Sequence, residues 1–194
     1  MITRVPLIFF QGCDSTIEYF PYFQSTYVAV AASLNGGNCL ATFVKMLQEW
    51  AVDLGLSINQ SKIWEKTIAL GQNQASSEDG KTELIINPTL FGERHDPTLK
   101  GSSSNITTSN LSLGHVTRAI CNGIARNLAD MMSPETLKEA GMTKIIGSGA
   151  CLSRNPVLMQ EFQNIYQMPF EFTSEGSACI GAALAAIDVH FSDE

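Results

Sequence analysis

Apolar residues recur along much of this chain at steps of three and four, the spacing of one face of a helix. Residues 40–54 follow this spacing and predict an amphipathic helix that ends near Gly55. Residues 113–131 carry the clearest stripe of this kind, and Trp64 and Ile68 indicate a second, shorter helix. The pattern therefore predicts at least three amphipathic helices before residue 132.

Other segments have the short apolar runs that are typical of strands. Residues 27–33 are β-prone and end at Asn35-Gly36-Gly37, a strong turn signal. Residues 84–86 predict another strand. The polar stretch 75–80 and the Ser/Thr/Asn-rich stretch 101–110 are expected to be surface loops.

The last third of the chain alternates helices and strands. Ser133-Pro134 and Asn155-Pro156 each combine an N-cap residue with proline at the first helical position, and Gly141 ends the first of these two helices. Between and after them the sequence predicts strands at 143–146 and 170–172 and helices at 157–166 and 177–189. Since neither an internal repeat nor a clear linker interrupts the order, we expect a single α/β domain.

The net charge and the cysteine content limit the kinds of ligand and the cellular compartment that we expect for this protein. The 194 residues carry a net charge of −7, which argues against nucleic acid as a partner because such a surface needs clustered Lys and Arg. An anionic ligand would have to be held by backbone N–H groups. The five cysteines are odd in number, widely spaced and without a CxxC pair, which is typical of reduced thiols in a cytoplasmic protein.

A short apolar run at residues 5–10 is the one feature that resembles a targeting signal. It is shorter than the core of a signal peptide and no small-residue cleavage pattern follows it. No stretch approaches the length of a membrane span. We therefore expect a soluble protein without a membrane partner.

The segment with the most chemical content is Lys144-Ile-Ile-Gly-Ser-Gly-Ala150, which precedes the helix start at Asn155. A strand that passes through small residues into a helix lets backbone N–H groups approach an anion closely. The helix N-terminus adds a partial charge of about +0.5. The alternative is a tight turn that only packs strand on helix, and the local spacing alone does not separate the two.

A dinucleotide-binding unit competes with this interpretation, because Glu171 lies at a suitable distance downstream to hold a ribose. Leu152, however, stands where the third glycine of that fingerprint belongs. Gly80-Lys81-Thr82 lacks the leading glycine of a P-loop. The histidines His95, His115 and His190 show no metal-ligand spacing, and Glu93-Arg94 on its own is typical of a solvated turn.

Five blocks taken in order make the chain resemble the C-terminal domain of the FGGY carbohydrate kinases. They are Leu34-Asn-Gly-Gly37, Pro88 with Gly92-Glu-Arg94, Leu111-Ser-Leu-Gly-His115 with Arg118-Ala119, Gly147-Ser-Gly-Ala150, and Cys179-Ile-Gly-Ala-Ala183. Within the family, residues 19–23, 30–40 and 91–95 are most similar to kinases that phosphorylate a ketose. The resemblance covers residues 19–190 and leaves 1–18 unassigned and 191–194 as a tail.

The resemblance implies an α/β domain with the ribonuclease-H-like fold of actin-type ATPases, equivalent to the second half of a two-domain sugar kinase. It implies ATP or ADP as ligand, with Mg²⁺ bound mainly through the nucleotide phosphates. By position it places Gly37 and Ala41 beside the nucleotide. The implied loop around the nucleotide is Gly147, Ser148, Gly149 and Ala150, and one of Ser153, Arg154 and Asn155 would face the adenosine, with Ser153 and Asn155 as the candidates.

In that family the first domain supplies the other phosphate loop, most of the sugar pocket and the general base, and nothing in this sequence matches it. The resemblance therefore implies that this chain by itself has no kinase activity and no catalytic residue of its own. It also implies an exposed interdomain surface that promotes self-association. A non-catalytic nucleotide-binding or scaffold protein of the same fold is the alternative, and an NAD-dependent oxidoreductase module is a third hypothesis.

Overall fold

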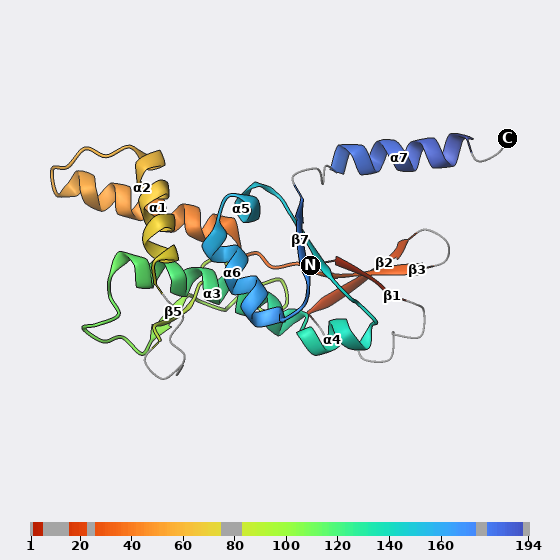
Figure 1. Cartoon of the computed structure of the whole chain (residues 1–194), viewed down its shortest axis with the longest axis horizontal. Coiled ribbons are helices and arrows are strands. Elements are labelled where there is room, and N and C mark those ends of the chain that lie inside the picture. The colour runs from red at the N-terminus through yellow and green to blue at the C-terminus, as the bar shows by residue number, and fades with distance from the viewer. Residues whose placement is uncertain (1, 6–15, 23–25, 75–82, 174–177, 192–194) are drawn as a thin grey trace.

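The computed structural model describes residues 2–5, 16–22, 26–74, 83–173 and 178–191 (Figure 1). Its first sheet has three antiparallel strands in the order β1-β3-β2: β1 (Ile2–Val5), β2 (Ile17–Tyr22) and β3 (Thr26–Ala31). The strand predicted at 27–33 is confirmed as β3. β1 and the start of β2 lie in the segment that the sequence left unassigned.

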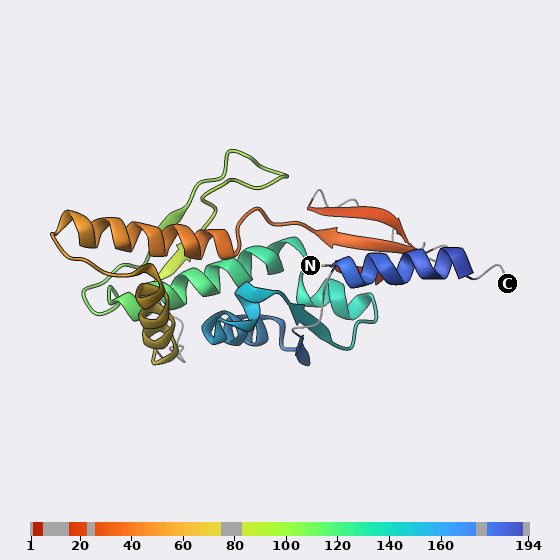
Figure 2. The same ribbon diagram turned by 90° about the horizontal axis from the view of Figure 1, so that it is seen from above.

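Four long helices form the layer that carries the core. They are α1 (Gly37–Asp53), α2 (Gln60–Gln72), α3 (Leu113–Met131) and α6 (Pro156–Tyr166), and each coincides with a predicted helix. Figure 2 shows α3 running between α1 and α6. α3 also contacts α2, so it is the helix around which the others pack.

A short hairpin lies beside α3. β4 (Ile85–Asn87) was predicted, whereas β5 (Ser102–Ser104) falls in the stretch expected to be a loop, so that expectation was wrong there. β5 consists of three exposed serines, so its sequence lacks the alternation of apolar and polar residues that predicts a strand. The strand exists because its backbone pairs with β4, with Ile86 opposite Ser103.

The last third alternates helices and strands as predicted. After α4 (Pro134–Glu139), β6 (Ile145–Ser148) and β7 (Phe170–Thr173) pair in parallel, and α7 (Ala178–Phe191) follows. One element was missed, the single-turn helix α5 (Ala150–Ser153). The turn after β6 therefore enters α5 first, and α6 begins only at Asn155-Pro156.

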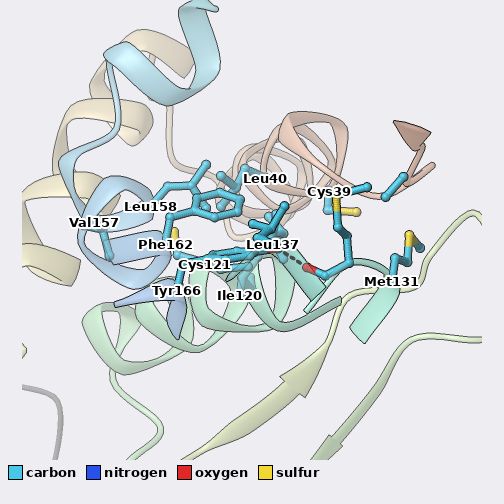
Figure 3. Packing of buried hydrophobic residues seen from close by; sticks show 14 of the residues in the cluster. Cys39, Leu40, Ile120, Cys121, Met131, Leu137, Val157, Leu158, Phe162 and Tyr166 are labelled. Carbon is cyan, nitrogen blue, oxygen red and sulfur yellow. Dashed lines mark hydrogen bonds between the residues drawn. The ribbon is translucent and has the colours of Figure 1, made fainter. Parts of the chain in front are cut away.

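The core lies between α1, α3 and α6 (Figure 3). Leu40 from α1, Cys121 from α3, and Val157 and Tyr166 from α6 are buried there. The Tyr166 hydroxyl donates a hydrogen bond to the Met132 carbonyl at 3.1 Å. This packing fixes α6, and with it the turn that precedes α6.

The other side of the sheets is open. Along β2, Tyr19 packs against the core while Phe20 and Tyr22 are 47% and 50% exposed. On β6, Ile146 is 60% exposed. Figure 1 shows α7 apart from the other elements. Among the described helices, none has both the length and the apolar content that crossing a bilayer requires.

Candidate functional site

The turn after β6 forms one wall of the site. Ser148 and Gly149 are exposed, and Gly149 has a φ of +103°, a conformation that glycine adopts without strain. A Cβ built on Gly149 would meet nothing within 4 Å. The turn therefore leaves room for a ligand beside its backbone.

The start of α1 faces this turn. Gly36 is the N-cap of α1 and provides no side-chain cap, and the first turn of the helix carries no acidic residue. Gly37 lies directly against Cys151 of α5, because a Cβ at position 37 would come within 2.6 Å of the Cys151 Sγ atom. Glycine permits this approach without displacing the thiol, so the N-terminus of a 17-residue helix lies against α5.

Two clefts meet at Gly37 and Cys151. The first, of about 590 Å³, is bounded by the loop before α1, by Ser148 and Gly149, and by a floor of apolar side chains from α3 and α6. The second, of about 480 Å³, lies between Gly37 and α2. Its lining consists of Gly37, Ser61, Trp64, Ile68, Cys151, Arg154 and Asn155. The two clefts share Gly37 and Cys151, have predominantly apolar walls, and are together called the groove below.

The structure brings some of the predicted residues together at this groove. Gly37, Ser148 and Gly149 line the first cleft, and Asn155 lines the second. The Asn155 side chain is already used as the N-cap of α6, where it accepts a hydrogen bond from the Leu158 N–H group at 3.1 Å.

The other predicted residues have different positions. Gly147 is buried, and a Cβ there would lie 2.7 Å from Leu152, so this glycine serves the packing of the turn. Ala41 is exposed on α1, and Ser153 is exposed at the end of α5. The side chain of Ala150 lies outside the described residues.

A buried carboxylate behind the first cleft was missed. The sequence suggested that Glu93-Arg94 is a solvated turn, which is correct for the exposed Arg94 and wrong for Glu93, whose exposure is 0%. Burial raises the pKa of Glu93, but hydrogen bonds from Asn35, Leu34, Asn127 and Ser33 outweigh it and hold that pKa below its usual value. Glu93 is therefore ionised at neutral pH.

Three of the four described cysteines are unsuited to act as nucleophiles. Cys39, Cys121, Cys151 and Cys179 are free thiols, while Cys13 lies outside the described residues. Burial raises the pKa of Cys39 and of Cys151, and raises that of Cys121 to about 12. These three thiols are protonated at neutral pH and are poor nucleophiles.

The residues considered for a dinucleotide or metal site make local contacts with neighbouring side chains. Glu171 pairs at 2.8 Å with Lys144, the residue just before the neighbouring strand β6, and both side chains are about half exposed or more. His115 lies at the start of α3, where its Nδ1 atom is 2.7 Å from the Ser112 hydroxyl. Within the described ranges, no group of three or more His, Cys, Asp or Glu side chains could hold a metal ion.

Comparison with known proteins identifies relatives of the whole domain. Sedoheptulokinases from Homo sapiens and Mus musculus are each 47% identical over 178 residues, which is 92% of this chain and 36% of theirs. The chain thus spans little more than a third of the length of these relatives. The sequence of residues 19–23, 30–40 and 91–95 indicated that, within the family, this chain is most similar to sedoheptulokinase. The 47% identity confirms that similarity.

Solved structures of sugar kinases share the fold. A xylulose kinase from Rhodospirillum rubrum superimposes with a TM-score of 0.71 at 20% identity, covering 92% of this chain and 34% of that one. The glycerol kinase of Plasmodium falciparum, solved with ADP, gives 0.57 at 16% identity, covering 86% of this chain and 31% of that one. The predicted α/β, actin-type fold is therefore confirmed. The model of the C-terminal domain of the FGGY family of carbohydrate kinases matches residues 18–187, and the chain belongs to that family.

Proposed function

We propose that this domain is the adenine-nucleotide-holding half of a carbohydrate kinase. The observation that carries the proposal is the meeting of the β6–α5 turn with the start of α1, whose N-cap residue Gly36 has no side chain, around one cleft. At about 590 Å³ the cleft falls within the range of roughly 300–1,000 Å³ that is usual for small-molecule sites. A nucleotide half-enclosed there would have its second wall in another domain.

The phosphates would lie between Gly37 and Gly149. The Cβ direction of Gly149 is open, so its backbone can approach phosphate oxygens, and the partial positive charge of the α1 N-terminus at Gly37 favours an anion. This arrangement suits a chain with a net charge of −7, because it needs no basic patch.

The adenine would occupy the second cleft, where Trp64 and Ile68 offer apolar surface and Arg154 also lines the wall. Mg²⁺ would arrive with the nucleotide and would supply neutralisation of the phosphate charge for phosphoryl transfer. The described residues do not build a metal site of their own, so Mg²⁺ would be held chiefly through those phosphates.

The full reaction would transfer the γ-phosphate of ATP to the terminal hydroxyl of sedoheptulose in the cytoplasm. Identity of 47% to two sedoheptulokinases supports this substrate. Phosphoryl transfer depends on positioning and on charge neutralisation from both sides of the transferred group. The sugar pocket and the general base would come from a domain outside these 194 residues, so we expect the 194-residue chain alone to be inactive.

Calorimetric titration of the purified chain with ATP and ADP in the presence of Mg²⁺ tests nucleotide binding. Gly149→Ala strains the backbone at the turn and should weaken binding. Gly141→Ala is a matched control, since Gly141 also has a positive φ, +75°, and an equally open Cβ direction, but lies between α4 and β6. If the chain binds neither nucleotide, or if both variants bind equally, the site is wrong.

Activity separates the remaining hypotheses. Co-expression with the first domain of a sedoheptulokinase should restore phosphorylation of sedoheptulose. Tight nucleotide binding without restored activity would favour the non-catalytic scaffold. Preference for NAD over ATP, or loss of that binding in Glu171→Ala, would favour the oxidoreductase module. Phosphorylation by the 194-residue chain alone would refute the expected inactivity.

A further inference from the structure

Glu93 is a buried carboxylate that is stabilised by hydrogen bonds from neutral donors. Its Oε1 atom accepts hydrogen bonds from the Ser33 hydroxyl at 2.8 Å, Asn35 Nδ2 at 2.8 Å and Asn127 Nδ2 at 2.7 Å. Its Oε2 atom accepts one from the Leu34 N–H group at 2.8 Å. Burying a carboxylate is costly unless such bonds replace its water.

Three of these donors are consecutive residues that lead into α1. Ser33, Leu34 and Asn35 follow β3 and directly precede Gly36-Gly37. The Asn35 side chain adds further ties, donating to the Gly92 carbonyl at 2.6 Å and accepting from the Phe91 N–H group at 3.1 Å. The path of the chain into the first turn of α1 is thus set by contacts with the turn that carries Glu93.

The fourth donor connects this cluster to the floor of the first cleft. Asn127 belongs to α3, between Ile124 and Leu128, which both line that cleft. Glu93 therefore joins the loop before α1 to the helix beneath it. Gly92 makes the inward turn of Glu93 possible, because it has a φ of +67° and a Cβ there would lie 2.7 Å from the Pro97 carbonyl oxygen.

We propose that Glu93 is a positioning residue for nucleotide binding, which fixes the start of α1 through Ser33, Leu34 and Asn35 without touching the nucleotide. The proposal rests on the nucleotide site described above. An ionised carboxylate accepts on both oxygens, whereas a glutamine of the same shape would present an NH₂ donor to at least one of these donors. Glu93→Gln should therefore release the loop while it preserves volume.

The test compares ADP affinity, stability and amide hydrogen exchange in the 194-residue chain and its Glu93→Gln variant. We expect affinity to fall at least about tenfold, equivalent to about 1.4 kcal/mol. The amides of residues 34–38 should exchange faster, while the cooperative melting transition remains. If Glu93→Gln does not fold, Glu93→Asp keeps the charge, shortens its reach, and should show a smaller loss of affinity in the same direction.

Two controls exclude a general loss of stability. Arg94→Gln changes the exposed neighbour in the same turn and should leave the affinity unchanged. Glu161→Gln removes another buried carboxylate, outside the clefts, and should lower stability without a comparable loss of affinity. If Glu93→Gln binds ADP like the unaltered chain, or loses no more affinity than Glu161→Gln, the positioning role is refuted. If the unaltered chain binds no nucleotide, the proposed function itself fails.

Discussion

Gly37, the first residue of α1, lies against Cys151 of α5 so closely that an added Cβ would be 2.6 Å from the Cys151 Sγ atom. We predict that Gly37→Ala displaces this thiol into the groove and weakens nucleotide binding about five- to tenfold, or about 1–1.4 kcal/mol. The free energy of unfolding should change by less than about 1 kcal/mol, because a flexible side-chain end can move aside. Calorimetric titration and urea unfolding measure the two effects.

The double variant Gly37→Ala/Cys151→Ala is the control for this mechanism. It removes the Sγ atom and leaves only the Cys151 Cβ atom, 3.1 Å from the added methyl group. Affinity should recover in part. Normal affinity in the single variant, or no recovery in the double one, would contradict the displacement.

The buried Glu93 carboxylate should make stability depend on pH in the acid range. Hydrogen bonds hold its folded-state pKa below the usual value in spite of burial, so the unfolded chain binds the proton more readily. Its contribution is complete above the unfolded pKa, about 4.3, and is lost as the pH falls through the lower folded-state value. Urea unfolding between about pH 5 and pH 3 should thus show a steeper loss of stability for the unaltered chain than for Glu93→Gln.

Other carboxyl groups do not disturb this comparison. Glu65, Asp96 and Glu135 also have lowered pKa values, but they titrate in both proteins and their effect cancels in the difference. Parallel pH profiles for the two proteins would show that Glu93 contributes no such stability.

Helical periodicity predicted the main helices because the apolar residues of each buried face recur at steps of three and four along the sequence. The stripe in residues 113–131 became α3, which contacts α1, α2 and α6. The cap residues Ser133 and Asn155 placed two helix starts correctly, since capping depends only on neighbours three residues away. Local physics was sufficient for these elements.

The remaining features depend on contacts between distant residues. β5 has three serines and exists through its pairing with β4. Glu93 and Asn35 are 58 residues apart and bond only because Gly92 turns the chain inward. A Glu-Arg pair in a sequence gives no sign of which side chain is buried. The small-residue turn after β6 did point to the groove, but the intervening α5 left no apolar stripe to detect.

Breaking the buried ion pair between Arg118 of α3 and Glu161 of α6 should strongly destabilise the fold. The two side chains are 8% and 2% exposed, and Arg118 also donates to the Gly71 carbonyl at 3.1 Å. Arg118→Ala leaves the Glu161 carboxylate buried without its cation, at a cost of about 3–5 kcal/mol in unfolding free energy. Urea unfolding measures this loss.

Two further variants test whether the unpaired charge is responsible. Arg118→Met/Glu161→Met leaves no buried charge and should lose much less stability than Arg118→Ala. Lys45→Ala breaks the exposed pair with Glu49, whose side chains are 69% and 60% exposed, and should cost less than about 1 kcal/mol. A double variant as unstable as the single one would show that packing, not charge, is decisive.

The open side of the sheets should make the isolated chain associate with itself. Phe20, Tyr22 and Ile146 are about half exposed or more, and interdomain surfaces of about 600–1,500 Å² are usual within two-domain chains. We expect dye binding and concentration-dependent sedimentation, both reduced in Phe20→Ser/Ile146→Ser. Trp50→Ser, on α1 and 55% exposed, controls for apolar exposure elsewhere and should change neither. A dye-negative monomer at all concentrations would contradict the predicted self-association.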